Sequence, residues 1–302
     1  MIPLIRRILN SRLKLSVVVI AYNMDREMLR TIYSLSPAYQ RGVTGSEYEV
    51  IVVDNGSESP LKTDHWISRP GWKIRFFRLP PGDVSPCSAI NAGVENARAS
   101  HVCVMVDGAR MLSPGVIDGI LQQIRISSDS FVFTLGWHLG PQPQNVSITQ
   151  GYSQKLEDKM LRQARWREDG YRLFDIASLA ASSRGGWFSS INESNCFAIS
   201  RAQFKVMGGF DQRFVSPGGG LVNLDFFKRA VESALLKPCV LLGEGSFHQV
   251  HGGVATNVPM EDHPGSVFAE EYQNIRGLAY QSPIYEPLYV GRLSQSARRF
   301  LS

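Results

Sequence analysis

The sequence predicts an α/β protein with a mostly parallel central sheet flanked by helices. Short apolar runs rich in valine and isoleucine alternate with helix-like stretches from residue 15 to residue 139. Two of these runs, SVVVIAYN at 16–23 and VIVVDNGSES at 50–59, stop abruptly at small and acidic residues. Strands that alternate with helices are typical of βαβ units, whose parallel strands are joined through helices packed on the sheet.

The first half of the chain divides into strands and helices by this pattern. The predicted strands cover residues 15–21, 48–53, 74–78, 101–106 and 131–139, and the predicted helices cover residues 26–35, 85–99 and 113–126. Pro86 and Pro114 lie in the first turns expected for the last two helices, where a backbone N–H would have no partner within the helix and proline is therefore tolerated. Ser113 is the cap expected for the helix at 113–126.

After Gly140 the pattern is less regular. The elements predicted there are a charged, solvated helix at 155–167, an exposed loop at 182–186, a strand at 194–200, a helix at 201–207, a glycine-rich stretch at 217–220, a helix at 224–236, a strand at 238–242 and a loop at 247–257. The tail from about residue 261 has little β character, and we expect it to pack on the core.

Composition narrows the class of protein. A chain of 302 residues with 43% hydrophobic and 20% charged residues is long enough for a buried core and ordinary for a globular protein. The net charge of +5 fits an anionic ligand or an acidic membrane surface, but falls well short of a nucleic-acid-binding patch. The four cysteines are widely separated, which favours reduced core thiols in a cytosolic protein.

The sequence also indicates whether the protein could span or contact a membrane. No run of eighteen apolar residues occurs, so we predict no transmembrane helix. Residues 1–16, MIPLIRRILNSRLKLS, mix isoleucine and leucine with basic residues. As a helix this segment would be basic and amphipathic, which permits peripheral contact with a membrane. A helix packed on the domain, or a frayed end, is the alternative that we favour.

Acidic residues follow two of the predicted strands. Asp54 ends the strand at 48–53, and Asp107 follows the strand at 101–106. Open α/β sheets bind ligands at the carboxyl ends of their strands. A carboxylate at this edge can accept a hydrogen bond from a nucleobase imide or a ribose hydroxyl, so we predict a nucleotide pocket at Asp54. The alternative for Asp54 is a side chain that only closes a turn after the strand.

Five segments in this order resemble the family 2 glycosyltransferases of GT-A fold. They are VVVIAYN, VIVVDNGS, DVSPCSAINAGVENA, MVDGAR, and NCFAISRAQFKVMGGFDQRF with a glycine run and NLDFFKRA after it. The resemblance spans roughly residues 15–251. It implies a GT-A domain over residues 1–260, with a nucleotide-binding half (1–140), an acceptor-side half (141–260) and a C-terminal extension (261–302) that packs on it.

The resemblance also implies an activity. It is the transfer of a sugar from a nucleotide-sugar donor, UDP-linked by expectation, to a hydroxyl of a glycan or glycolipid in cell-surface polysaccharide synthesis. The expected location is the cytoplasm, with peripheral contact at the inner membrane face. In the family an aspartate at the position of Asp54 contacts the base, the backbone around Ala21 and Tyr22 lines the same pocket, and the segment of Asn91 and Gly93 lies against the donor. Close packing is the other explanation for Gly93.

The resemblance implies a divalent cation, Mn²⁺ or Mg²⁺, held by Asp107 in an acidic motif. Here that motif is degenerate, because Ala109 stands where a second carboxylate is usual. Arg110 is expected to supplement the metal by pairing with phosphate. The family often places a histidine nearby, and FHQVHGG offers His248 and His251. We expect one of them, His251, to bind the metal or a phosphate, rather than both together.

The catalytic base is the least conserved part of the resemblance. Asn223 occupies the usual position of the base, and an amide cannot accept a proton at neutral pH. The carboxylates left as candidates are Asp225, the leading one, which would otherwise be a helix N-terminal residue, and Glu193.

Two other functions stay open at this point. Ala109 and Asn223 are compatible with a non-catalytic nucleotide-sugar-binding or scaffold protein. A nucleotidyltransferase would need a glycine- and arginine-rich phosphate loop after the first strand, and AYNMDREM has none.

Overall fold

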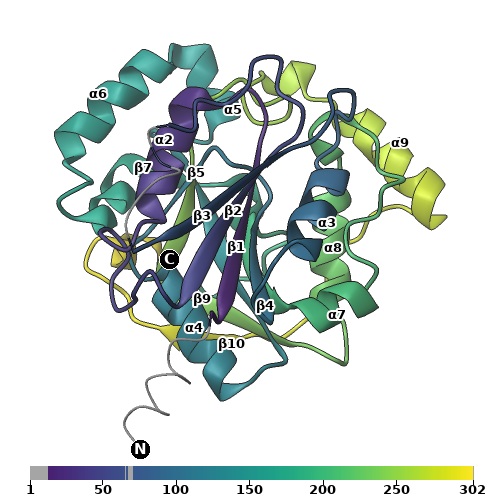
Figure 1. Ribbon diagram of the computed structural model, residues 1–302. Coiled ribbons are helices and arrows are strands. Elements are labelled where there is room, and N and C mark those ends of the chain that lie inside the picture. The colour runs from purple at the N-terminus through teal and green to yellow at the C-terminus, as the bar shows by residue number, and fades with distance from the viewer. Residues whose placement is uncertain (1–12, 65, 67–70, 302) are drawn as a thin grey trace, which may run out of the picture.

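The protein is built on one large mixed sheet, which Figure 1 shows between two groups of helices. The computed structural model describes residues 13–64, 66 and 71–301. The N-terminal segment 1–12, and with it most of the predicted membrane-contacting helix, lies outside the described residues.

The strands follow the order β10-β9-β6-β8-β4-β1-β2-β3, with β5 paired to β9 and β7 paired to β6. Their bounds are β1 Leu15–Ala21, β2 Tyr48–Asp54, β3 Lys73–Arg78, β4 His101–Met105, β5 Arg110–Leu112, β6 Ser130–Leu139, β7 Ala177–Leu179, β8 Cys196–Ser200, β9 Lys237–His248 and β10 Leu288–Gly291.

The prediction of a mostly parallel sheet is confirmed. Strands β3, β2, β1 and β4 pair in parallel, and so do β6, β9 and β10. Between these two groups lies β8, which is antiparallel to both β4 and β6. Because β8 is antiparallel to β6, the long irregular segment between them leaves and rejoins the sheet at the same edge.

Helices cover both faces of the sheet. Their bounds are α2 Asp25–Ser34, α3 Cys87–Glu95, α4 Val116–Ile126, α5 Gln144–Ser147, α6 Gln154–Ala164, α7 Arg201–Val206, α8 Val222–Val231 and α9 Gly265–Arg276. In Figure 1, α2 and α6 lie on one side of the strands, and α3, α8 and α9 lie on the other.

Alternate residues of β1 belong to different cores. Val17 and Val19 pack in the cluster that contains α2 and α4, whereas Val18 and Ile20 pack in the cluster that contains α3, α7 and α8. Successive side chains of a strand point to opposite faces, so a strand buried on both faces needs apolar residues at every position. The unbroken apolar run at residues 17–21 of β1 therefore specifies a central strand.

Two local predictions are wrong in an informative way. Helix α6 is not simply a solvated face, because Glu157 is fully buried and pairs with Arg26 and Arg30 of α2. The strand predicted at 238–242 runs on to His248, because β5 and β6 supply partners for its second half.

The C-terminal segment adds α9 and β10 to the fold. Phe268 and Tyr272 of α9 are buried, and β10 pairs in parallel with β9.

All four cysteines are free and buried, in line with the prediction of reduced core thiols. Within the described part of the chain, no helix is long and apolar enough to cross a membrane.

The N-terminus of α4 is capped by a residue from a distant strand. Ser113 does not cap the helix as predicted, but donates its hydroxyl to Glu244 of β9. The carboxylate of Glu244 also accepts the backbone N–H of Gly115 at 2.9 Å and the hydroxyl of Tyr171 at 2.6 Å. Burial is the largest influence on this group, and it raises the pKa of Glu244 from 4.5 to about 6.

We expect Glu244 to make stability fall as pH rises. Between about pH 4.5 and pH 6 the native protein holds a proton on this carboxyl that the unfolded chain has lost. The free energy of unfolding should therefore decrease across that window by about 2 kcal/mol, the equivalent of the pKa difference. Urea unfolding at several pH values should give a flatter profile for Glu244→Gln than for the unmodified protein. The exposed Glu270→Gln is the control, and an unchanged slope in Glu244→Gln would contradict the assignment.

Candidate active site

Three side chains of types that can bind a metal meet at the carboxyl edge of the sheet. Asp107 follows β4, His248 ends β9, and His251 lies in the turn after it. In β5, Arg110 pairs directly opposite His248, and the N–H of Gln249 donates to Ala109 O at 2.8 Å. This short ladder fixes the segment after Asp107 against the end of β9.

The three side chains are close enough to share one ion. Asp107 Oδ2 lies 2.9 Å from His248 Nε2 and 3.6 Å from His251 Nε2, and the two Nε2 atoms are 3.2 Å apart. The other carboxylate oxygen of Asp107 accepts the N–H of Ala109 at 2.9 Å, which orients the group. Both histidines face Asp107, because β9 extends far enough to carry His248 to the site. That His251 rather than both together binds a metal or phosphate stays a prediction.

Buried amides orient both histidines. His248 Nδ1 lies 2.7 Å from Gln144 Oε1, which also accepts Asn257 Nδ2 at 2.8 Å. An amide oxygen can only accept, so Nδ1 carries a proton and Nε2 is the ring nitrogen that faces Asp107. Asn257 Oδ1 in turn accepts the N–H of His251 and of the two glycines that follow. Such outer partners fix the tautomer and direction of metal-binding histidines.

The charges in this cluster are coupled. Burial by itself would raise the pKa of Asp107, but attraction to His251 and His248 outweighs it and lowers that pKa well below 3.8. Burial lowers the pKa of His248 to about 4, so its imidazole is neutral near pH 7. For His251, burial is outweighed by the charge of Asp107, which raises the pKa.

Arg110 is a buried cation with unused donors. It is 4% exposed, and its Nε lies 3.9 Å from Asp107 Oδ2. Among the described residues, its Nε and Nη1 have no hydrogen-bond partner. Burial lowers the pKa of the Arg110 guanidinium. Unpaired buried donors are costly, so this arrangement suits an anion that would fill them.

The two candidate bases have different surroundings. Glu193 is half-buried, and its Oε2 accepts the Nδ2 of the buried Asn223 at 2.8 Å. Asp225 on α8 is 2% exposed. Arg276 binds both of its carboxylate oxygens, at 2.6 and 2.7 Å, and Arg229 adds a third contact at 2.8 Å. Asp225 thus ties α8 to α9, whereas Glu193 keeps a carboxylate that is free of ion pairs among the described residues.

The predicted nucleoside residues lie at the ends of β1 and β2. Asp54 is fully buried, and its Oδ1 accepts the N–H and the hydroxyl of Ser57 at 2.9 and 2.6 Å. Its Oδ2 has no hydrogen-bond partner among the described residues, with Arg78 Nε 3.5 Å away. Ala21 O accepts the N–H of Asn55, and Tyr22 is exposed at the same edge. Asp54 therefore closes a turn, and its second oxygen is paired with Arg78 but accepts no hydrogen bond among the described residues.

Helix α3 uses its predicted donor-side residues for packing. The amide of Asn91 bonds both ways to the backbone of Phe210, at 2.8 and 3.0 Å. A Cβ on Gly93 would lie 2.4 Å from Val18 Cγ1, so this glycine lets the helix approach β1 closely. Packing explains Gly93, and Asn91 holds the loop after α7 in place.

Sequence reasoning missed three residues that support the site: Gln144, Glu157 and Asn257. The carboxylate of Glu157 accepts the N–H of Val250 at 2.8 Å, directly before His251. None of the three lies in a recognisable motif. Only the acidic charge of Glu157 within a helix of mixed charge was visible, and charge alone does not distinguish a buried from a solvated carboxylate.

Comparison with known proteins defines the class. The fold and the acidic edge of the sheet are those of a GT-A glycosyltransferase. The sequence model of the family described as Glycosyl transferase family 2 matches residues 16–174, and the chain belongs to this family. The matched region contains Asp54 and Asp107 but ends before His248. A search of curated protein sequences found no match.

Solved structures with a similar fold include Staphylococcus aureus TarS. TarS 1–349 in complex with UDP has a TM-score of 0.53 and 15% identity, over 87% of this chain and 66% of that one. TarS 1–349 in complex with UDP-GlcNAc has a TM-score of 0.53 and 14% identity, over 87% of this chain and 67% of that one. At this identity the likeness shows the fold, and the chain spans about two thirds of these TarS chains.

The arginine contacts of Asp225 lead to a prediction about stability. Asp225→Asn removes the charge that Arg229 and Arg276 neutralise, so we expect the free energy of unfolding to drop by roughly 2–3 kcal/mol. The turnover of the folded fraction should stay unchanged. Urea unfolding and active-site-normalised kinetics measure the two effects, with the exposed Asp262→Asn as control. A large loss of turnover without loss of stability would instead make Asp225 a catalytic group.

Proposed function

We propose that the chain transfers a sugar from a UDP-linked donor to a hydroxyl of a glycan or glycolipid acceptor. The observation that carries this proposal is the meeting of Asp107, His248 and His251 at the carboxyl edge of a family 2 fold. The TarS structures bound to UDP and UDP-GlcNAc support uridine diphosphate as the nucleotide. Cell-surface polysaccharide synthesis at the inner membrane face is the setting that we infer for this activity.

The nucleoside would lie at the ends of β1 and β2. Ala21 and Tyr22 would line the pocket, and the unused Oδ2 of Asp54 would accept the imide N–H of the base. A buried carboxylate oxygen without a partner is costly, so a ligand donor there would lower the energy of the bound state. Asn91 would act indirectly, through the loop that it holds.

The donor set at Asp107 fits a divalent cation. Two imidazole nitrogens and a carboxylate oxygen lie within 4.8 Å of one another, and this combination suits Mn²⁺ better than Mg²⁺, which prefers oxygen ligands. Asp107, His248 and His251 would hold the ion. When bound, it would neutralise charge on the departing nucleoside diphosphate. Arg110 would use its unfilled donors on a phosphate oxygen, which compensates for the carboxylate missing at Ala109.

Glu193 is the better candidate for the catalytic base. Its carboxylate would take the proton of the acceptor hydroxyl while that oxygen bonds to the sugar C1 and the bond from C1 to the diphosphate breaks. Asn223, at the usual position of the base, would orient Glu193 through the hydrogen bond at 2.8 Å. Asp225 is less suited to this role, because three guanidinium contacts stabilise its charged form.

Metal and nucleotide binding test the donor site. We expect Mn²⁺ to strengthen UDP binding, and Asp107→Asn or His251→Ala to weaken Mn²⁺ binding by more than the 10–100-fold typical of an outer-shell partner. Titration calorimetry with Mn²⁺ and with UDP measures both, and His263→Ala is the control. Equal Mn²⁺ affinity in all variants would contradict the proposed ligands.

Turnover tests the base. Glu193→Gln should lower kcat by about 100- to 10,000-fold while the Kd for UDP stays unchanged, because general-base catalysis contributes that much. Hydrolysis or transfer from UDP-GlcNAc with Mn²⁺ is the measurement, and Asp225→Asn is the comparison. UDP binding without turnover on any acceptor would favour the alternative, a non-catalytic nucleotide-sugar-binding protein.

A further inference from the structure

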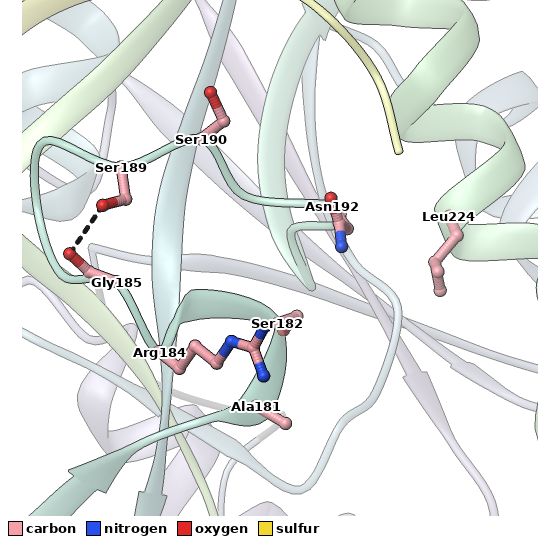
Figure 2. Close-up of a pocket in the computed structure, with 8 residues that line it drawn as sticks. All are labelled: Ala181, Ser182, Arg184, Gly185, Ser189, Ser190, Asn192 and Leu224. Carbon is pink, nitrogen blue, oxygen red and sulfur yellow. Dashed lines mark hydrogen bonds between the residues drawn. The ribbon is translucent and has the colours of Figure 1, made fainter. Parts of the chain in front are cut away.

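A pocket of about 590 Å³ opens beside the Glu193–Asn223 pair. Its walls come from the loop between β7 and β8 and from the first turn of α8, as Figure 2 shows. Its polar lining consists of Ser182, Arg184, Ser189, Ser190 and Asn192. Leu224 forms an apolar wall opposite the loop. Clefts of this size commonly bind small ligands.

The pocket adjoins the residues that would carry the reaction. Asn192 precedes Glu193 in the chain, and Leu224 follows Asn223. The side chains of Glu193 and Asn223 are hydrogen-bonded to each other at 2.8 Å, so the two walls meet at the candidate base.

The other end of the pocket approaches Arg110. Ser183, next to Arg184, accepts the N–H of Gly136 at 3.0 Å. A Cβ on Gly136 would lie 3.8 Å from Arg110 Nη1 and 3.9 Å from Ser183 Oγ. The turn that carries Ser183 and Arg184 therefore packs against β6 close to Arg110, the guanidinium proposed to hold phosphate.

Arg184 gives this pocket a positive charge. It is the charged member of the lining, which includes no carboxylate. Within the described part of the chain, its guanidinium makes no ion pair or hydrogen bond. Two other exposed arginines are paired, Arg165 with Glu168 at 2.6 Å and Arg213 with Asp211 at 2.7 Å, whereas Arg184 lines a pocket that holds no carboxylate. In Figure 2, the Arg184 side chain extends toward Ser182 of the same loop.

We propose that this pocket is the acceptor subsite and that Arg184 binds an anionic group on the acceptor sugar. This inference rests on the proposed function. A guanidinium binds phosphate or carboxylate through two parallel hydrogen bonds, and either group would satisfy it. The serine hydroxyls and the Asn192 amide match sugar hydroxyls, which both donate and accept. The acceptor is thus a phosphorylated or uronic-acid-containing saccharide rather than a neutral one.

Three probes of equal ring size test the proposal: methyl glucoside, methyl glucoside 6-phosphate and methyl glucuronoside. Binding of each to the UDP-saturated protein is measured by calorimetry or by ligand-observed NMR. We expect at least one charged probe to bind about tenfold more tightly than the neutral one, and the better of the two identifies the anion. Arg184→Gln should remove this preference, and Arg184→Lys should restore part of it. Arg98→Gln, at an exposed arginine outside the pocket, should leave it unchanged.

The outcomes separate this inference from the proposed function. Equal or absent binding of all probes to the unmodified protein would overturn the anionic acceptor. An equal loss of UDP binding in Arg184→Gln would also overturn it, because Arg184 would then contact the donor diphosphate. If UDP does not bind at all but the charged probes bind in an Arg184-dependent way, the proposed function fails and the anion site stands.

Discussion

The pairing of β5 with the end of β9 is the interaction on which the site depends. Strands β4 and β9 are separated in the sheet by β8 and β6, which places their axes roughly 14 Å apart at the usual strand spacing. A side chain cannot cross that distance. The chain after Asp107 therefore leaves β4, and three residues of β5 align beside β9 with Arg110 opposite His248. This short antiparallel ladder brings a carboxylate from one half of the sheet to the histidines of the other.

Around this ladder, buried polar side chains hold the histidines in place. Gln144 is hydrogen-bonded to His248. Asn257 accepts three backbone N–H groups of the turn at His251. Glu157 accepts the N–H of Val250, which lies between the two histidines in the chain. Polar groups buried in this way stabilise one arrangement only when their hydrogen bonds are satisfied. Arg110 differs from the groups that hold the histidines, because its Nε and Nη1 have no hydrogen-bond partner among the described residues, and a ligand would suit them.

The sequence was a good guide to the sheet and to the residues at strand ends. Apolar runs at β1, β2 and β4 are long and bounded by acidic or small residues. The positions of these strands, and the placement of Asp107 at the carboxyl edge of the sheet, were therefore predictable. The meeting of His248 with Asp107 was not, because it requires a three-residue strand that is too short to leave a periodic pattern. The partner of Asp225 was hidden for another reason. Arg276 lies 51 residues further along the chain, and only the tertiary fold brings the two together.

The strand order has a consequence for how the site assembles. Strands β1 and β2 and the helix between them are close in sequence, so the nucleoside side of the site can form from local contacts. Strand β9 pairs with β6, which lies about a hundred residues earlier in the chain. Strand β5 can pair only after β9 is in place. Contacts between residues far apart in the sequence form late, because closing the long loop between them loses conformational entropy before the contact adds any stabilisation. A chain still emerging from the ribosome would therefore form the edge at Asp54 well before β9 brings His248 and His251 to Asp107.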